Sequence, residues 1–497
     1  MNRHHSSQPL ELEIKFRLAP GAQAALDREA TLQSDRKARH EVTTYFDTGA
    51  GTLAREGASL WVRCRGGERV QTLKLRSKGD GPFGRGEWEW LVSSERPEPE
   101  LLMDTPAAGL LSAGEALNPV FVTDVQRVVS TVRTDGAIIE AAVDQGRLIA
   151  GNSAEEIHEL ELELQDGDRA SLYRLAASLH VNVPMVLGAE SKADRGWRLR
   201  TGCPREAVTY ADAKLPTDAT TAEAFRRIVE DGLAHFMANQ PAAAAGDVEG
   251  VHQMRIGVRR LRAALMLFQP TIEPHAEASL TEALRSLGRI FGQARDWDVF
   301  CLEVLPSAEE HGVGRSWLDL LCGPAEAKRA MAHRFVADLL DGPALTATVL
   351  GLAELAAMNP PSMQEPMAVI APNLLERLER KVLRRGRHIA RHDDAELHAL
   401  RKTMKKLRYS VEFLAPLLPH KQTKAFLHQC KRLLKQLGAL NDAVVAVALA
   451  EQLGGERQPE LAPAVAMLAG WAAGQRAAAR DRLPKQWHTL PSVPLPG

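Results

Sequence analysis

The start of the chain alternates strictly between apolar and charged residues. In residues 10–18 the even positions are apolar, whereas the odd positions are Glu11, Glu13, Lys15 and Arg17. Successive side chains of a β-strand point to opposite faces, so this pattern predicts a strand with one apolar and one charged face. Taken alone, the pattern fits an ordinary solvent-facing strand equally well.

Later segments repeat this alternation with the same types of charge. The charged positions that recur in this way are Arg63, Arg65, Lys74, Arg76, Glu87, Glu89, Glu159, Glu161 and Glu163. Further strands are expected over residues 41–47, 120–132 and 137–143, the last of them ending in a turn at 144–147. Many antiparallel strands with one charged face predict a barrel with a charged lumen. The helical segments 20–30 and 170–180 are candidates to cover its apolar outer face.

A lumen that carries both signs of charge suits a polyphosphate held together with a divalent metal. Guanidinium and ammonium groups neutralise phosphate oxygens, and Arg does so with a bidentate fork. Carboxylates are the hard oxygen ligands that Mg²⁺ and Mn²⁺ prefer. The alternative is an internal lattice of salt bridges, but the desolvation of buried ions often cancels their attraction. So many buried charges therefore favour a functional lumen.

Residues 8–203 resemble the CYTH superfamily, the triphosphate tunnel metalloenzymes. The match rests on the ExExK signature at residues 11–15, on YFDT at 45–48, on the LWVRCR, TLKLR and ELELEL strands and on SKADRG at 191–196. The resemblance implies an eight-stranded antiparallel tunnel with a triphosphate along its axis. It implies Mg²⁺ or Mn²⁺ held by Glu11, Glu13, Glu161 and Glu163. It also implies phosphate contacts from Lys15, Arg63, Arg65, Lys74, Arg76, Arg127, Lys192 and Arg195, supported by Glu87, Glu89 and Asp144.

The second half of the chain is predicted to be helical. Residues 204–219 lack periodicity and read as a linker, after which apolar residues recur at helical spacing and prolines separate the helices. Residues 252–262 and 398–408 share the pattern H-x-x-R-x-x-x-(R/K)-(R/K)-L-R, and Asp296 and Asp442 follow at the same offset of 146 residues. The constant offset predicts duplicated bundles over about 220–365 and 366–485.

Each repeat carries a basic stripe, since its His, Arg and Lys residues recur on one helix face. Like charges on one face repel, which favours a bound polyanion; the alternative is a solvated face or pairing with Asp296 and Asp442. This half, over 220–485, resembles the CHAD domain, which implies two four-helix bundles related by a pseudo-twofold axis and a channel that binds inorganic polyphosphate. The residues concerned are His252, Arg255, Arg259, Arg260, Arg262, His398, Arg401, Lys405, Lys406 and Arg408.

Composition narrows the remaining classes. A chain of 497 residues with 45% hydrophobic and 25% charged residues is typical of globular protein with two or three domains. Five cysteines without a CxxC pair argue against a disulfide framework or a zinc site and fit a reducing cytoplasm. No signal peptide or apolar run of membrane-spanning length is recognised. The basic stripes lack interleaved aromatic residues, which disfavours nucleic acid as a partner.

The sequence therefore predicts an α+β multidomain hydrolase that cleaves inorganic triphosphate in a tunnel and binds inorganic polyphosphate through its helices. Two alternatives stay open. One is a tunnel enzyme for an organic triphosphate, either a thiamine triphosphatase or a class IV adenylate cyclase. The other is a non-catalytic protein that binds polyphosphate or targets polyphosphate granules.

Overall fold

The computed structural model divides into two compact units. The first comprises residues 1–208, 233–245 and 339–358, and the second comprises 209–232, 246–338 and 359–497. The residues described are 10–76, 81–112, 115–134, 136–203, 206–210, 214–272, 274–454, 459–491 and 493–496. Within these ranges, all named strands belong to the first unit, and the second unit is helical.

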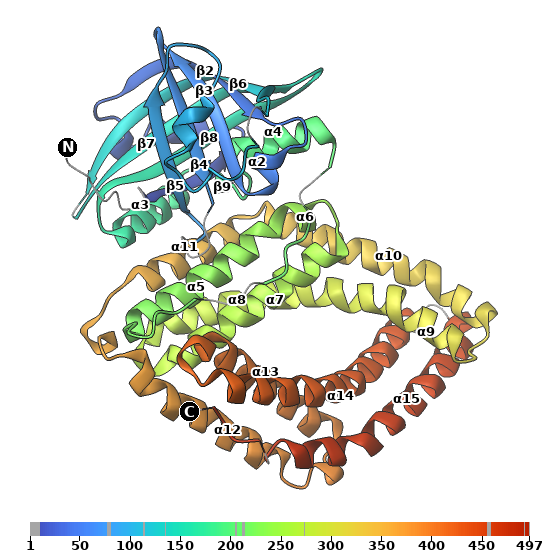
Figure 1. Ribbon diagram of the computed structural model, residues 1–497. Coiled ribbons are helices and arrows are strands. Elements are labelled where there is room, and N and C mark those ends of the chain that lie inside the picture. The colour runs from blue at the N-terminus through green and yellow to red at the C-terminus, as the bar shows by residue number, and fades with distance from the viewer. Residues whose placement is uncertain are drawn as a thin grey trace. The chain divides into compact units, whose positions relative to one another are not determined.

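A closed antiparallel barrel forms the centre of the first unit (Figure 1). The strand order is β5-β4-β3-β2-β6-β7-β8-β1, and pairing of β1 with β5 closes the barrel, while the short β9 adds to β1. The predicted eight-stranded barrel is thus confirmed. The strands are β1 Leu10–Leu18, β2 Lys37–Asp47, β3 Ala58–Arg65, β4 Glu68–Leu75, β5 Gly84–Leu91, β6 Asn118–Thr134, β7 Ala137–Ala150, β8 Ser153–Gly167 and β9 Met185–Leu187.

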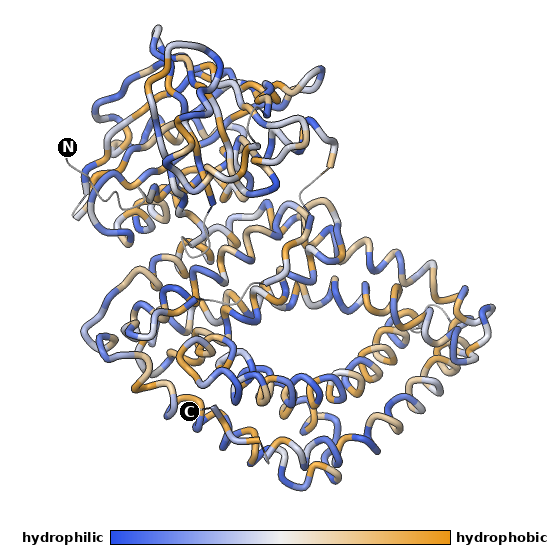
Figure 2. Tube along the Cα trace, viewed as in Figure 1, coloured by the Kyte–Doolittle hydropathy of each residue, from blue (hydrophilic) through white to orange (hydrophobic). Residues whose placement is uncertain are grey.

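The register of β1 shows why its odd residues face the lumen. Glu11 lies opposite Arg85 of β5, Glu13 lies opposite Glu163 of β8, and Lys15 lies opposite Glu161. Directly opposite residues of an antiparallel pair share a face, so these registers gather charged residues of three strands on one side. Ile14, on the other face of β1, is fully buried. The alternation of hydrophilic and hydrophobic positions is visible along the strands in Figure 2.

Short helices accompany the barrel. They are α1 Ala22–Leu26, α2 Thr52–Arg55, α3 Arg169–Asn182 and α4 Lys192–Thr201, together with α6 Gln240–Ala244 and α11 Pro343–Ala357 from later in the chain. The two predicted covering helices correspond to α1 and α3. Helix α4 begins with a capping box, in which Ser191 and Asp194 each accept from the other's backbone N–H. This cap fixes the residue that follows it, Lys192, at the start of the helix.

The predicted turn at residues 144–147 is wrong, because β7 continues through it to Ala150. Asp144 lies opposite Arg127 of β6 and its side chain is fully buried. Gly146 also lies within the strand, where an added Cβ would fall 2.0 Å from the carbonyl oxygen of Asp124. The sequence Asp-Gln-Gly-Arg suggested a turn, but here the Asp is held by its ion pairs and the Gly by close approach of the backbones.

Within the described residues, eight long helices form the helical half of the chain. In the first repeat they are α5 Thr221–Ala238, α7 Val248–Phe268, α8 Pro274–Val299 and α10 Arg315–Leu340, and in the second α12 Met367–Gly386, α13 Asp394–Leu414, α14 His420–Leu453 and α15 Ala462–Thr489. A π-helical turn, Phe300–Val304, and the short α9 Leu305–Glu310 follow α8. Pro324 was expected to separate two helices, but it lies inside α10.

The helical repeat is visible in the helix boundaries. Helices α5, α7 and α8 begin at residues 221, 248 and 274, and α12, α13 and α14 begin 146 residues later at 367, 394 and 420. The two repeats also exchange a pair of equivalent backbone hydrogen bonds. Thr221 N donates to Glu365 O, and its counterpart Met367 N donates to Ala219 O, each at 2.9 Å. A pseudo-twofold axis between the repeats requires this exchange. The structure thus shows the predicted duplication.

Helix α14 alone, among single helices of the described chain, is long and apolar enough by composition to cross a membrane. Within the protein, 44% of its apolar window is buried, and α14 packs against α13 and α15. The sequence-based expectation that no run reaches this length therefore needs correction. Because the core helix of a bundle meets the same criterion, its packing accounts for the apolar composition.

Candidate active site

Two clusters of carboxylates lie in the barrel lumen. The first contains Glu11 of β1, Glu87 of β5 and Glu163 of β8, and one carboxylate oxygen of each lies within 4.8 Å of the others. The second contains Asp144 of β7 with Glu159 and Glu161 of β8, at the same mutual spacing. Both sets of oxygen ligands have the spacing that a hard divalent cation needs. They differ in the basic groups around them.

In the second cluster, lumen cations already satisfy the carboxylates. Asp144 accepts two hydrogen bonds of 2.7 Å from Arg127, and Lys192 Nζ lies 2.7 Å from Asp144 Oδ2. Glu161 accepts from Lys15 at 2.5 Å, from Lys192 at 2.8 Å and also from Arg127. Burial acts to raise the pKa of Glu161, but Lys15, Lys192 and Arg127 hold this pKa well below its usual value. Lys192 and Arg127 likewise lower the pKa of Asp144, so Asp144 and Glu161 are ionised and paired with these cations.

The first cluster has too little positive charge. Lys74 is the shared partner: its Nζ lies 2.6 Å from Glu11 and 3.5 Å from both Glu13 and Glu87. Burial and the repulsion of Glu11, Glu89 and Glu163 raise the pKa of Glu87 to about 8, although Lys74 opposes this. Burial, Glu11 and Glu13 raise the pKa of Glu163 to about 7. Carboxylates that repel one another in this way call for a further cation.

The first cluster therefore has uncompensated negative charge that a metal ion could balance, whereas the carboxylates of the second cluster are already paired with lumen cations. Three carboxylates from three strands offer only oxygen donors, which suits Mg²⁺ or Mn²⁺ and not a soft metal. The sequence had placed Glu87 in a supporting role, whereas the structure brings it together with Glu11 and Glu163. Glu13 lies beside them but pairs with Lys15 at 2.7 Å, and Glu161 lies among the cations of the second cluster.

Four lumen cations beside the two acidic clusters neutralise carboxylates. They are Lys15, Lys74, Arg127 and Lys192, each with a side chain no more than 15% exposed. Burial opposes their charge, but the surrounding carboxylates raise the pKa of each of them above its usual value. They are thus fixed cations from four different elements, β1, β4, β6 and α4, directed into one lumen.

The other predicted tunnel residues have different surroundings. Arg195 is buried and bonds Glu155 at 2.7 Å and Glu159 at 3.1 Å, so it supports β8. Arg63 lies 3.8 Å from Glu41, and Arg65 lies 3.5 Å from Glu68 at the exposed end of β3. Glu89 is exposed and accepts from Thr72 at 3.1 Å. Arg17 is exposed at the end of β1.

Sequence reasoning missed three charged residues of the lumen face. Glu41 of β2 is only 2% exposed and lies 2.5 Å from Arg39, with Arg63 and Arg127 within 3.9 Å. Arg85 of β5 lies opposite Glu11. The parity of the strands was the available signal, because Arg85 has the parity of Glu87 and Arg39 has that of Glu41.

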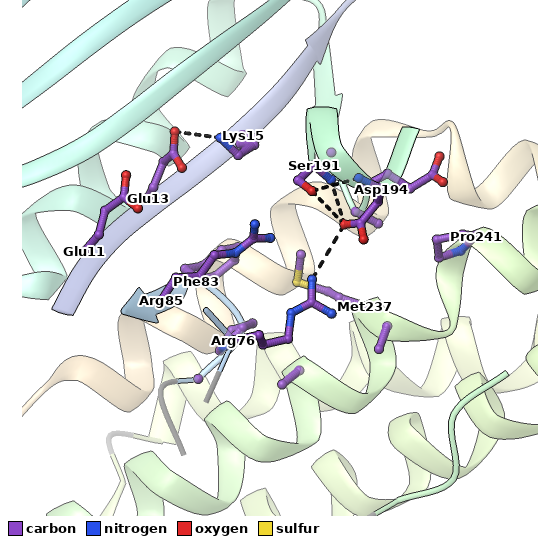
Figure 3. Close-up of a pocket in the computed structure, with 17 residues that line it drawn as sticks. Glu11, Glu13, Lys15, Arg76, Phe83, Arg85, Ser191, Asp194, Met237 and Pro241 are labelled. Carbon is purple, nitrogen blue, oxygen red and sulfur yellow. Dashed lines mark hydrogen bonds and ion pairs between the residues drawn. The ribbon is translucent and has the colours of Figure 1, made fainter. Parts of the chain in front are cut away.

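A cavity of about 110 Å³ opens beside the N-terminal half of β1 (Figure 3). Its charged lining comes from β1 and β5 and from the segment around the start of α4. Arg76 lies 3.7 Å from Asp194 across this cavity, and Lys15 bonds Glu13 at its edge (Figure 3). The basic residues that line it are Lys15, Arg76 and Arg85. The cavity thus borders Glu11 of the first acidic cluster and is lined by three basic residues.

The second unit contains a separate cavity of about 200 Å³ that both repeats line. Helices α7 and α13 contribute equivalent residues to it, and α8 and α14 contribute the acidic pair Asp296 and Asp442. Arg255 bonds Asp296 at 3.0 Å, and His398 Nδ1 lies 2.7 Å from Asn441 Oδ1. The basic lining consists of His252, Arg255, Arg259, Arg295, Arg401 and Lys405.

Positive charge is undercompensated in this cavity. Burial together with Arg259, Arg401 and Arg255 lowers the pKa of Lys405 to about 6, against the weaker effect of Asp442. Burial likewise lowers the pKa of Arg259, whose guanidinium bonds the Tyr409 hydroxyl at 2.8 Å and does not meet a carboxylate there. Neighbouring cations that depress one another's pKa values form a site prepared for an anion.

Five predicted anion-binding residues do not line this cavity, and His398 is one of them. Arg260 is 5% exposed, bonds Glu412 at 2.8 Å and stacks 3.5 Å from the Tyr210 ring centre, so it joins α7 to α13. Arg408 lies 3.2 Å from Glu412 on its own helix. Arg262 and Lys406 also lie outside the lining residues. The helical stripes are therefore divided: Arg255 and Arg259 of α7 and Arg401 and Lys405 of α13 line the cavity, whereas the C-terminal residues of both stripes do not.

Family models match both halves of the chain. A CYTH domain matches residues 9–197, and a CHAD domain matches residues 227–451. The chain contains a CYTH domain and a CHAD domain. Its CYTH domain supplies the barrel and the two acidic clusters, and its CHAD domain supplies the duplicated helices and the basic cavity.

Relatives of each domain are known. The chain is 30% identical over 194 residues to an inorganic triphosphatase of Haemophilus influenzae, an alignment that covers 38% of this chain and 54% of the relative. A CHAD domain structure from the plant Ricinus communis is 29% identical and has a TM-score of 0.52, covering 59% of this chain and 99% of its own. PptA from Streptomyces chartreusis is 16% identical with a TM-score of 0.46, and the match covers 54% of this chain and all of PptA.

Proposed function

We propose that the CYTH domain hydrolyses inorganic triphosphate to pyrophosphate and phosphate with a divalent metal, and that the CHAD domain binds inorganic polyphosphate. One observation carries the enzymatic part. Glu11, Glu87 and Glu163 converge in a lumen where their mutual repulsion is not neutralised, directly beside fixed Lys and Arg side chains. The similarity to an inorganic triphosphatase supports the same substrate class.

The residues divide into two roles. The first acidic cluster would hold Mg²⁺ or Mn²⁺, which supplies charge stabilisation on phosphate oxygens and lowers the pKa of a bound water. Lys15, Arg127 and Lys192 orient the phosphate chain from the opposite part of the lumen. Because these cations are already desolvated and held by carboxylates, they meet the substrate without reorganising, which favours charge stabilisation in the transition state.

Phosphate release from a panel of substrates tests the enzymatic proposal. Inorganic triphosphate, ATP and thiamine triphosphate are compared with Mg²⁺ and with Mn²⁺, and the bare triphosphate should have the highest kcat/KM. Glu11→Ala and Glu163→Ala should each reduce kcat/KM by at least about 100-fold, since a metal ligand acts on every step that needs the metal. Preference for thiamine triphosphate, or cyclic AMP formed from ATP, would favour an organic substrate instead.

Glu156→Ala is the matched control, because Glu156 lies on β8 with Glu163 but is exposed and has the opposite parity. Its kcat/KM should equal that of the unsubstituted protein. If Glu11→Ala and Glu163→Ala keep full activity, the metal-site assignment is wrong. If no triphosphate is cleaved while polyphosphate still binds, the chain is a non-catalytic polyphosphate-binding protein.

The basic cavity between α7 and α13 supports the polyphosphate part of the proposal. This cavity of about 200 Å³ is lined by five Arg or Lys side chains and by three Asp or Glu side chains. Polyphosphate binding by the full chain should survive Glu11→Ala and fail when Arg255 and Arg401 are both replaced by Gln. Equal affinity for single-stranded DNA at matched salt would show a general polyanion site, because phosphate contacts alone carry no sequence or ligand identity.

A further inference from the structure

Arg85 differs from the other basic residues that line this cavity, because no ion-pair partner is found for it among the described residues. Lys15 pairs with Glu13 and Glu161, and Arg76 pairs with Asp194. Arg85 makes no hydrogen bond or ion pair through its side chain with any residue that the structure describes. A half-buried guanidinium without a carboxylate partner is uncommon next to an acidic cluster, since such groups normally neutralise one another.

The position of Arg85 follows from the seam that closes the barrel. Only three residues of β1 pair with β5, and Glu11 lies directly opposite Arg85. The two side chains therefore share the lumen face, and Arg85 lies two residues before Glu87 on that face. Lys74 occupies the Glu11 carboxylate at 2.6 Å. Arg85 consequently extends past Glu11 into the cavity, as Figure 3 shows.

The backbone around Arg85 is closely packed. Gly84 and Gly86 flank Arg85, and an added Cβ at Gly86 would fall 2.7 Å from the Trp88 ring. The carbonyl of Phe83, two residues before Arg85, accepts a hydrogen bond of 3.0 Å from Glu13 N. The backbone around Arg85 is thus fixed against the strand that carries Glu11 and Glu13, so its guanidinium is presented to the cavity from a rigid element.

We propose that Arg85 is a further phosphate-binding residue of the tunnel, contacting the substrate phosphate that lies on the cavity side of the Glu11–Glu87–Glu163 cluster. This inference rests on the proposed triphosphatase function. The guanidinium fork matches two phosphate oxygens, and it gives up no carboxylate partner when it binds them. Arg85 thus contributes to holding the ground-state substrate, and its loss raises KM more than it lowers kcat.

The test compares Arg85→Ala, Arg85→Gln and Arg85→Lys in the full chain. For Arg85→Ala and Arg85→Gln we expect KM for inorganic tripolyphosphate to rise about 10- to 100-fold, the range of a lost hydrogen-bonded contact to a charged group, with a smaller change in kcat. Arg85→Lys should restore part of the loss, because it keeps the charge but not the fork. Thermal unfolding verifies that the variants fold, and the Lys variant serves if the other two do not.

Calorimetric binding of tripolyphosphate without metal is the second readout, and every protein compared also carries Arg255→Gln and Arg401→Gln so that the helical cavity does not contribute. It separates this inference from the proposed function, since a protein without hydrolytic activity still reports the dissociation constant. Arg147→Ala is the matched control, an exposed arginine on the outer face of β7. The inference is overturned if Arg85→Ala and Arg147→Ala both bind tripolyphosphate as the protein that retains Arg85 and Arg147 does, or if that protein does not bind it.

Discussion

The barrel lumen and the helical cavity both collect Arg and Lys residues, but they treat the charge in opposite ways. In the lumen, Lys15, Lys74 and Lys192 touch carboxylates, and these raise the pKa of each lysine. In the helical cavity, Lys405 faces three arginines, and its pKa falls to about 6. The lumen is therefore a prepaired lattice with a deficit of cations at one cluster, whereas the helical cavity has a deficit of anions.

The difference separates two kinds of polyphosphate site. A prepaired lattice fixes each cation in position before the substrate arrives, which suits a reaction that needs a defined geometry. A cavity with surplus charge attracts a polyanion at long range and gains most when the anion arrives, which suits binding of a chain without chemistry. Substitutions in the two regions test this difference. Removing a charge should lower the stability of the barrel but raise that of the helical domain.

The largest effect is expected from breaking the lattice. Asp144→Asn removes the carboxylate that pairs with both Arg127 and Lys192, leaving two buried cations with less countercharge. We expect the free energy of unfolding of the barrel to fall by about 3 kcal/mol, the lower end of what breaking a buried ion pair costs. Hydrogen exchange in urea, measured on peptides of β6, β7 and β8, reports this domain separately.

Asp124→Asn is the control for this prediction. Asp124 pairs with His40 at 2.5 Å, but both side chains are more than half exposed. Its removal should change the unfolding free energy by less than about 1 kcal/mol. If Asp144→Asn leaves the barrel as stable as Asp124→Asn does, the lumen is not a prepaired lattice, and the contrast with the helical cavity fails.

The second prediction concerns the surplus charge of the helical cavity. Replacing both Arg255 and Arg401 by Gln should weaken polyphosphate binding about 100-fold at low salt, since each contributes a charge-assisted contact from one repeat. The same double substitution should flatten the decrease of affinity with salt, because fewer counterions are released on binding. Arg262→Gln with Lys406→Gln is the matched pair outside the cavity, and its affinity should match that of the unsubstituted protein.

Much of this arrangement could be predicted from the sequence, because it depends on the two-residue alternation of the strands and on the 146-residue offset of the helical repeat. The alternation in residues 10–18 located Glu11 and Glu13, and the constant offset of the two His motifs located the duplicated helices. Strand parity also placed Glu87 on the lumen face. Sequence could not say that Glu87 joins Glu11, since that depends on the short seam between β1 and β5, which pairs segments more than seventy residues apart.

The errors have local causes. Gly146 suggested a turn, but in β7 it allows close approach of the neighbouring strand. Arg260 directly follows Arg259, which lines the cavity. A step of one residue around the helix turns the Arg260 side chain toward Glu412 and the aromatic ring of Tyr210. Composition could not separate these cases, because burial and pairing of a charged side chain are decided by residues distant in sequence.

The third prediction follows from the proton that Lys405 lacks at neutral pH. Its pKa of about 6 in the free cavity means that a bound polyanion, which favours the ammonium form, draws in one proton above that pH. Affinity for polyphosphate should therefore rise as pH is lowered from 8 toward 6, by up to about tenfold per pH unit, and level off below 6.

The groups that face Lys405 are Arg255 and Arg259 of α7, Arg401 of α13 and Asp442 of α14. Lys405→Met should lose most of this pH dependence, whereas Lys402→Met, an exposed position on the same helix, should keep it. Comparison of the two variants removes the titration of the polyphosphate itself. Equal pH profiles for Lys405→Met and Lys402→Met would show that Lys405 does not take up the proton.

The smallest expected effect is a gain in stability, whereas the first prediction was a loss. Lys405→Met should stabilise the CHAD domain by about 1 kcal/mol at pH 7, since it removes a buried amine that its neighbours keep from ionising. The unfolded chain binds this proton below its ordinary pKa of 10.5 and the folded chain releases it above about 6, so stability of the unsubstituted protein rises with pH across this window. The advantage of Lys405→Met should accordingly shrink toward pH 10. A variant that destabilises the helices at pH 7 would mean that Lys405 is paired after all, as the lumen lysines are.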